Sequence, residues 1–229
     1  GVSYGAPGQH DLLLQADQLF AKKKYTEAFN VYNGLFTNYR KFTPQTLLKM
    51  AFIKEGLGEY PEALYYLNIF YENYPDKKIF NKMKDIAERE KLEGYIYSDL
   101  EFFSNLYRTY HDEIIFGLMG LVFLYFLAVV TNKIFIKGIS TSSPYFFIVF
   151  LAGVFYATNF GEQIIAPSKG VILNENPLLM EAPSPGAKAL GTLTKGTRVT
   201  ITDETDIWYE IKLNDKKGFI RKFNFGKII

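Results

Sequence analysis

Cysteine is absent from the 229-residue sequence, and histidine occurs only as His10 and His111. The lack of cysteine excludes disulfide bonds, cysteine nucleophiles and cysteine metal sites, and it leaves the redox compartment open. Neither histidine has a nucleophile or a metal ligand at the spacing of a catalytic motif. We therefore predict a protein that is not an enzyme and that holds no metal or cofactor.

A strong excess of charge is also missing, because 26 Lys and Arg residues face 24 Asp and Glu residues. The formal net charge of +2 gives no basic footprint for a nucleic acid. We interpret Asp11, Asp17, Asp99 and Asp112 as solvated charges on helices. The sequence predicts no nucleic-acid partner.

Two uncharged apolar runs interrupt the polar sequence, IIFGLMGLVFLYFLAVV at 114–130 and PYFFIVFLAGVFYATNF at 144–160. A spanning helix needs roughly 17–25 apolar residues, so each run is long enough to cross a lipid bilayer. We predict a transmembrane hairpin with helices at 112–136 and 144–166; the alternative is a buried hairpin in a soluble core. Small residues are predicted to let these helices pack closely, namely Gly117, Gly120, Ala152, Gly153 and Ala157.

The charges around the two runs indicate an orientation. Lys133 and Lys137 flank the turn between the runs, and acidic residues flank the outer ends. Short loops with positive charge stay in the cytoplasm. We predict a two-pass protein of the bacterial inner membrane, with a cytoplasmic turn at 137–143 and both termini in the periplasm. A cleaved signal peptide or a truncated N-terminus each explain why the first residue is Gly1.

The N-terminal part repeats with a period of 35 residues, which is the spacing of Tyr25, Tyr60 and Tyr95. Each unit predicts a helix, a turn plugged by the tyrosine, and a second helix packed through a small alanine. The pattern resembles the tetratricopeptide repeat family, carried by Ala16, Tyr25, Ala28 and Tyr32 in the first unit and by Ala51, Tyr60, Ala63, Leu67 and Pro75 in the second. The resemblance implies an all-α repeat domain over 9–111, after a flexible 1–8, with a degenerate third unit.

Repeats of this kind stack into a concave scaffold whose inner wall comes from the first helix of each unit. We expect the wall to bind protein through six residues, Leu13, Asp17, Phe20, Leu48, Phe52 and Glu55. Leucine and phenylalanine favour an apolar or helical segment as the ligand. The alternative for Leu13 and Leu48 is that they are core residues between helices.

The C-terminal part alternates apolar and polar residues between recurring turn signals, which predicts short antiparallel strands and a small all-β barrel over 167–229. The order of its motifs resembles the bacterial SH3 family, through Leu190-Gly191-Thr192-Leu193, Lys195-Gly196-Thr197, Trp208-Tyr209 and Gly218-Phe219-Ile220. The resemblance implies a ligand such as a cell-wall peptide or a protein. We expect Trp208, Pro183 and Met180 to bind it, with Tyr209 inside the barrel and Trp208 partly exposed.

The order of repeat domain, membrane hairpin and SH3-like barrel resembles the BatE family of the Bacteroides aerotolerance operon, which is found in the Bacteroidota. The resemblance implies a non-enzymatic scaffold or adaptor subunit in the inner membrane, associated with stress and aerotolerance. Its implied partners are von Willebrand A-domain Bat proteins, a BatD-type protein and, indirectly, a MoxR-type AAA+ ATPase. The alternative function is a sensor that binds peptidoglycan through the SH3-like domain.

Overall fold

The computed structural model describes residues 7–39, 42–95, 103, 107, 110–135, 149–153, 155–156, 168–214 and 216–228. The chain forms two compact units, one made of Gly1–Ile96 with Ser168–Ile229 and the other of Tyr97–Pro167. The first unit therefore contains both the helical N-terminal region and the C-terminal sheet, which the segment 97–167 separates in the sequence.

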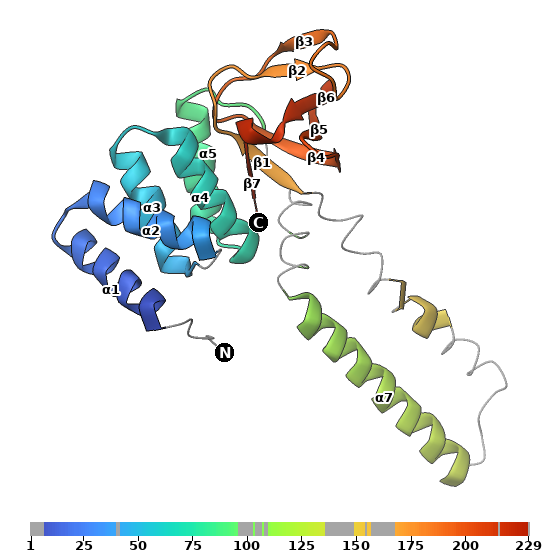
Figure 1. The fold of residues 1–229 in the computed structure, drawn as a ribbon. Coiled ribbons are helices and arrows are strands. Elements are labelled where there is room, and N and C mark those ends of the chain that lie inside the picture. Colours follow the sequence, from blue (N-terminus) through green and yellow to red (C-terminus); the bar gives the residue numbers. More distant parts are fainter. Residues whose placement is uncertain are drawn as a thin grey trace. The chain divides into compact units, whose positions relative to one another are not determined.

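Five helices form the N-terminal region, namely α1 (Pro7–Ala21), α2 (Tyr25–Tyr39), α3 (Pro44–Gly56), α4 (Tyr60–Asn73) and α5 (Lys77–Arg89). Each helix packs against the next one along the chain (Figure 1). The sequence sets where they begin: the Thr43 hydroxyl accepts the N–H of Thr46 ahead of α3, and the Asp76 carboxylate accepts the N–H of Lys78 ahead of α5. The alanines of the repeat pattern are all buried, namely Ala16, Ala28, Ala51 and Ala63.

The turns that follow α1, α3 and α5 have the same backbone geometry. In each turn a backbone N–H donates to the carbonyl five residues earlier, in the pairs Lys24–Leu19, Glu59–Lys54 and Leu92–Ala87. The residue before the donor has a left-handed backbone in all three turns, namely Lys23, Gly58 and Lys91. The first two turns are 35 residues apart, as the sequence period predicts, and the third comes two residues early. The internal repeat is thus present in the backbone as well as in the sequence.

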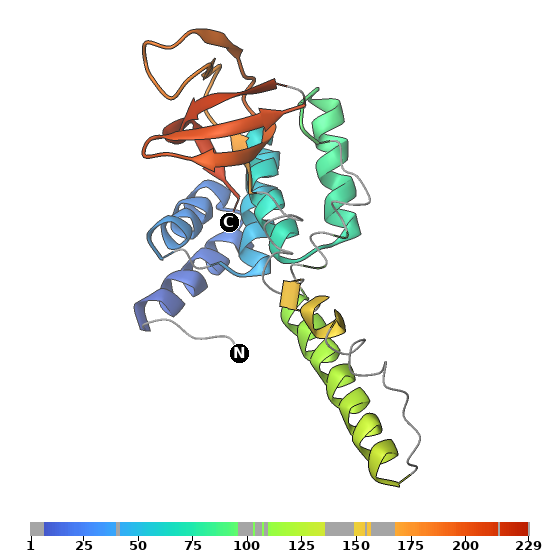
Figure 2. The same cartoon turned by 90° about the vertical axis from the view of Figure 1, so that its right-hand side faces the viewer.

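The C-terminal region is a seven-stranded sheet of β1 (Lys169–Ile172), β2 (Leu178–Met180), β3 (Ala189–Thr192), β4 (Arg198–Glu204), β5 (Trp208–Leu213), β6 (Lys216–Arg221) and β7 (Phe225–Lys227), with a 3-10 helix η1 (Lys222–Asn224) before β7. The order is β3-β2-β6-β5-β4-β1-β7, and the paired strands are antiparallel. Register shifts in the β4–β5 and β2–β3 pairs bend the strands, and the sheet curls (Figure 2). The prediction of an all-β C-terminal domain is confirmed, and the sheet is consistent with an SH3-like barrel.

The core of this barrel comes from the inward side chains of β5 and their neighbours. Tyr209, Ile211 and Leu213 all belong to the buried cluster, as the alternation predicts. Phe225 packs against the cluster from β7, with its ring centre 5.1 Å from that of Tyr209.

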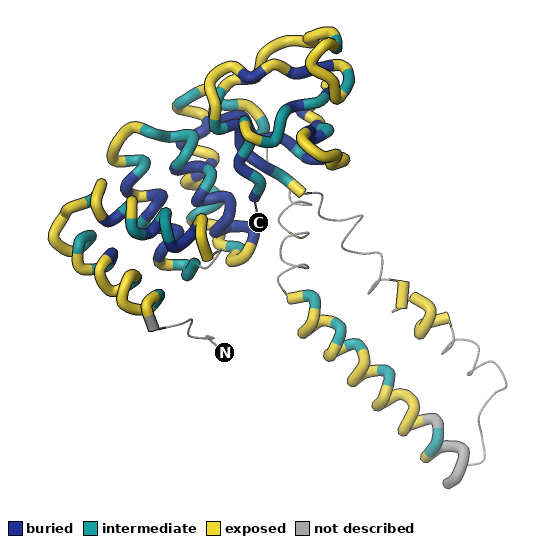
Figure 3. The backbone as a smooth tube through the Cα atoms, viewed as in Figure 1, coloured by how far each residue is buried: buried dark blue, intermediate teal, exposed yellow. Residues whose placement is uncertain are grey.

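The second unit contains α7 (His111–Phe135). Within the residues that the structure describes, this is the one helix long and apolar enough to cross a membrane, and none of its residues His111–Ala128 is buried. Large apolar residues such as Phe116 and Phe123 are exposed. The tube of α7 is coloured exposed or intermediate along its described residues (Figure 3). Of the second predicted helix, residues 149–153 and 155–156 are described and helical. The predicted turn at 137–143 lies outside the described residues.

Candidate interaction surfaces

The predicted protein-binding wall lies on two helices. Leu13, Asp17 and Phe20 are on α1, and Leu48, Phe52 and Glu55 are on α3. Five of the six side chains are half-buried, whereas Phe52 is 53% exposed. The wall residues therefore belong mostly to helix packing, and Phe52 is the one presented to solvent.

Phe52 belongs to a group of three rings from three helices, which we call the aromatic trio: Phe20, Tyr25 and Phe52. The ring centres lie 5.3 Å apart for Phe20–Tyr25, 5.9 Å for Phe20–Phe52 and 5.8 Å for Tyr25–Phe52, each in an edge-to-face arrangement. Such pairs stabilise by roughly 0.5–1.5 kcal/mol beyond the area they bury. The sequence identified Phe20 and Phe52 as wall residues and Tyr25 as a turn residue, but it did not bring the three together.

Both acidic residues of the wall are paired between helices. Asp17 on α1 accepts from Lys49 on α3 at 2.8 Å and from the hydroxyl of Tyr32, and Glu55 on α3 pairs with Lys82 on α5 at 2.7 Å. Burial, with the hydrogen bond to Asp17 as the second cause, raises the pKa of Tyr32. The charges of the wall thus connect α1, α3 and α5, and Phe52 is the exposed apolar side chain that the wall offers to a partner.

The expected exposure of Trp208 is wrong, because only 5% of this residue is accessible. Arg221 is its direct partner across the β5–β6 pair, and the guanidinium lies 5.3 Å from the centre of the ring. Met180 is buried as well, whereas Pro183, between β2 and β3, is exposed. Ligand binding by these three residues stays a prediction, with Pro183 as the accessible one.

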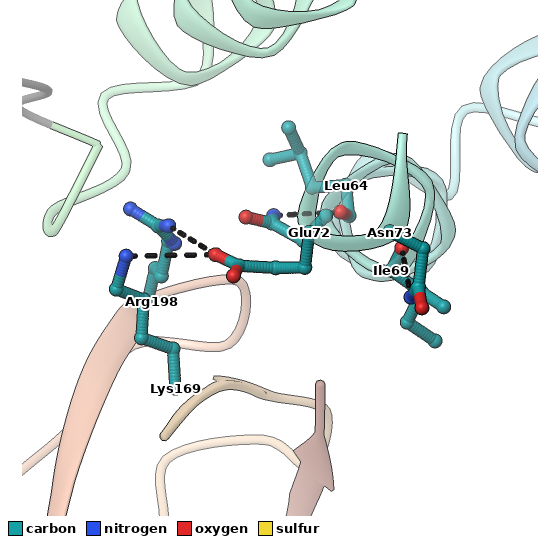
Figure 4. A network of polar contacts seen from close by, with 7 residues as sticks. Leu64, Ile69, Glu72, Asn73, Lys169 and Arg198 are labelled. Carbon is teal, nitrogen blue, oxygen red and sulfur yellow. Dashed lines mark hydrogen bonds and ion pairs between the residues drawn. The ribbon is translucent and has the colours of Figure 1, made fainter. Parts of the chain in front are cut away.

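A buried ionic cluster joins the helical region to the barrel within the first unit. A carboxylate oxygen of Glu72 on α4 lies 3.5 Å from both the Lys169 ammonium on β1 and the Arg198 guanidinium on β4 (Figure 4). The side chains are 6%, 12% and 4% exposed, respectively. Removing charges from water costs free energy, which attraction to opposite charges offsets. Here one carboxylate offsets that cost for two cations, so each cation depends on Glu72.

The turn after α5 forms the second part of this contact. The N–H of Arg198 donates to the carbonyl of Glu93 at 3.0 Å, and the hydroxyl of Tyr95 donates to the carbonyl of Gly196 at 2.9 Å. Gly94 has φ +87°, and a Cβ there would lie 1.8 Å from the Arg198 carbonyl oxygen. Only glycine accommodates this approach, because it lacks that Cβ and tolerates the left-handed backbone. The third tyrosine of the repeat therefore contacts the barrel.

Two further contacts extend the interface along α4. The Lys195 ammonium lies 2.9 Å from Glu62, and this hydrogen bond raises the pKa of Lys195. The Tyr65 hydroxyl donates to the carbonyl of Lys227 on β7 at 3.4 Å, and burial raises the pKa of Tyr65 to about 12. The edge strand β7 thus has α4 beside it.

The residues predicted to pack the membrane helices are placed only in part. Gly117 and Gly120 lie on α7, and Ala152 and Gly153 lie in the described helical residues of the second run. At the three glycines, no described atom from outside the glycine's own stretch of helix lies within 4 Å of the place that a Cβ would take. Ala157 lies outside the described residues, and the packing stays a prediction.

No metal centre is found among the described residues, since no group of three or more His, Asp or Glu side chains is placed to hold an ion. His111 lies 3.3 Å from the Asp112 carboxylate, its direct neighbour in the sequence.

The barrel and its curled antiparallel sheet define a small all-β domain docked on a helical repeat. Residues 181–223 match the bacterial SH3 domain family, a range that runs from the β2–β3 connection to η1. The strands β1, β2 and β7 lie outside the matched residues. No curated protein matches the chain. The tetratricopeptide and BatE resemblances stay predictions, because the match covers neither the helical region nor the segment 97–167.

Proposed function

We propose that this chain is a non-enzymatic scaffold or adaptor subunit of a multiprotein complex that faces the periplasm from a bacterial inner membrane. The docking of the helical repeat on the SH3 domain through Glu72 and Arg198 carries this proposal. The docking joins two domains into one unit, and both are of kinds that bind other proteins. It leaves the aromatic trio on α1, α2 and α3 available to a partner.

The docking also supports an even number of membrane crossings. A segment 97–167 that crossed once would put the helical region and the barrel in different compartments, which their buried contact does not allow. The helix α7 provides one candidate crossing, and the run at 144–160 is long enough for a second. With the lysine-flanked turn in the cytoplasm, both domains are periplasmic.

The spacing of the chain ends supports a hairpin. Glu93 accepts the N–H of Arg198, and Arg198 is paired with Val171 on the neighbouring strand. The described residues before and after the segment 97–167 therefore both contact Arg198, so the two ends of that segment start from neighbouring parts of the unit, which suits a hairpin.

The partners in this proposal are those that the domain order implies. They are von Willebrand A-domain Bat proteins and a BatD-type protein in the same membrane system. A MoxR-type AAA+ ATPase in the cytoplasm acts through them, because a turn at 137–143 offers it little surface. The process served is tolerance of stress and oxygen.

Affinity purification of the chain at native expression in a mild detergent tests the scaffold function. We expect other membrane proteins to co-purify at a fixed ratio, identified by mass spectrometry. A chain that purifies alone under these conditions contradicts the proposal.

The match to bacterial SH3 domains favours a second candidate, a sensor that binds peptidoglycan, which is a common ligand of this family. Retention of the full chain on purified sacculi tests it. Pro183→Ala is a better variant than Trp208→Ala, because Pro183 is exposed and Trp208 is buried. No retention of the unaltered chain rules this candidate out.

A further inference from the structure

We propose that the aromatic trio is the docking site for an apolar side chain of a partner polypeptide whose neighbouring residues are acidic. This inference rests on the proposed scaffold function, and it assigns a chemistry to the partner. The site lies where α1, α2 and α3 meet, with Phe52 as its exposed member.

A comparison of the two junctions in the repeat carries the first part of the argument. Glu55 and Tyr60 follow Phe20 and Tyr25 by one period of 35 residues. At the second junction, Glu55 pairs with Lys82 at 2.7 Å, and the Arg89 guanidinium lies 4.7 Å from the Tyr60 ring centre. Charged groups of α5 therefore contact Glu55 and Tyr60, whereas the aromatic ring of Phe52 contacts Phe20 and Tyr25 at the first junction.

A junction between two repeat units can therefore form without an exposed aromatic ring such as that of Phe52. An ion pair and a cation–π contact serve the second junction, whereas the first leaves Phe52 53% exposed. A large apolar side chain that is half in water costs solubility, and it gains free energy when a partner covers it. The exposed ring is therefore explained by binding rather than by packing.

The charges beside the trio define the partner further. Lys22 and Lys23 lie in the turn just before Tyr25, are exposed, and have no ionic partner among the described residues. Lys24 is paired with Glu27 at 3.0 Å, and Asp17 is neutralised by Lys49. The local excess is positive, so acidic residues in the partner are favoured by charge complementarity.

The shape of the trio favours a side chain over a flat ligand. All three ring pairs are edge-to-face, so the rings do not form a continuous flat surface on which a base or a sugar stacks. A branched or aromatic side chain on a polypeptide fits such a site, with its acidic neighbours near Lys22 and Lys23.

Panning a library of random peptides against the full chain in mild detergent tests the proposal. We expect enriched peptides to carry Phe, Leu or Ile beside Asp or Glu. Phe52→Ala should weaken their binding by roughly tenfold, the equivalent of about 1.4 kcal/mol. Charge reversal by Lys22→Glu with Lys23→Glu should weaken it by several-fold, and less so at high salt.

Phe223→Ala is the matched control, because Phe223 is an even more exposed ring, at 70%, on η1 of the barrel. It should leave peptide binding unchanged. All variants alter exposed residues, so thermal unfolding should stay close to that of the unaltered chain. Peptides that bind Phe52→Ala as tightly as the unaltered chain overturn the proposal, as does a library without any Phe52-dependent binder. A dimer of the chain that Phe52→Ala dissociates overturns it too, since a second copy is then the occupant.

The same variant separates this proposal from the scaffold function. If membrane proteins still co-purify with Phe52→Ala in full amount, the trio is not the docking site but the scaffold function stands. If nothing co-purifies with the unaltered chain, the scaffold function itself fails, whatever the peptides show.

Discussion

Glu72 and Arg198 lie 126 residues apart in the sequence, and their side chains meet at 3.5 Å where one is 6% and the other 4% exposed. Lys169 reaches the same carboxylate oxygen from the neighbouring strand. A single acidic side chain on α4 therefore holds both β1 and β4 of the barrel. Because of this contact, the helical region and the barrel form one compact unit and are not two independent domains.

Replacing Glu72 by alanine removes the carboxylate that Arg198 and Lys169 share. Breaking a buried ion pair in this way costs about 3–5 kcal/mol, because cations remain in a poorly solvated place. Glu175→Ala is the control, since Glu175 is 75% exposed and lies 3.5 Å from Lys195, and its loss should cost less than about 1 kcal/mol. Urea unfolding followed by the single tryptophan measures both. Equal losses in the two variants would show that the cluster does not hold the interface.

The close approach at Gly94 makes a second prediction. Gly94→Ala places a methyl group against the Arg198 carbonyl and strains a backbone with φ +87°, so it should destabilise the unit by at least about 1–3 kcal/mol. Gly34→Ala in α2 has open space at its Cβ and should instead stabilise by about 0.5–1 kcal/mol. Thermal unfolding of the two variants should therefore shift in opposite directions. A stable Gly94→Ala variant contradicts the docked arrangement.

High pH should weaken the docked unit. The pKa of Tyr65 is raised from 10.0 to about 12 by burial, and the pKa of Lys195 is raised above 10.5 by its hydrogen bond to Glu62. A raised pKa in the folded state means that the stabilisation is complete below the unfolded value and is lost as the pH rises through the folded one. The free energy of unfolding should thus fall between about pH 10 and pH 12. Tyr65→Phe lacks the ionising group and should show a smaller fall over that range; an equal fall excludes Tyr65 as a cause.

Periodicity explains what the sequence revealed. The spacing of 35 residues predicted turns at Tyr25 and Tyr60, and the structure has them at the residues just before. The alternation along β5 predicted that Tyr209 and Ile211 are buried. Both are local regularities, in which each residue is placed by its near neighbours. The bacterial SH3 match covers residues 181–223, which include the strands β3 to β6.

Contacts across the sequence could not be predicted in this way. Glu72 sits near the end of α4, and its sequence position does not reveal that its charge will be buried against the barrel. The expected exposure of Trp208 failed for a related reason. Alternation assigned it to the outer face of β5, but it did not reveal that Arg221 on β6 covers that face.

The cover over Trp208 can be removed by Arg221→Ala. Loss of the guanidinium exposes the indole, so the fluorescence maximum should move to longer wavelength and acrylamide should quench it more strongly. Lys222→Ala is the control, because the Lys222 ammonium lies 5.1 Å from the ring centre of Tyr209 instead. An unchanged spectrum in Arg221→Ala would show that other groups shield the indole.

The absence of cysteine allows each part of the chain to carry a unique label. Gly8→Cys reports on the helical region, Ser184→Cys on the barrel and Ser140→Cys on the predicted turn; Gly8 and Ser184 are both exposed. In cells with a permeable outer membrane, an impermeant thiol reagent should label Gly8→Cys and Ser184→Cys. Ser140→Cys should react only with a permeant reagent, because lysine-flanked short turns stay in the cytoplasm.

The outcomes of this labelling test the orientation in the membrane and the number of crossings separately. Labelling of Ser140→Cys by the impermeant reagent reverses the orientation but leaves the even number of crossings intact. Labelling of Gly8→Cys and Ser184→Cys from opposite sides is a stronger contradiction, because domains in different compartments cannot share the ion pair between Glu72 and Arg198. The Glu72→Ala variant gives the matching control: two crossings keep both labels on one side even when the domains no longer dock.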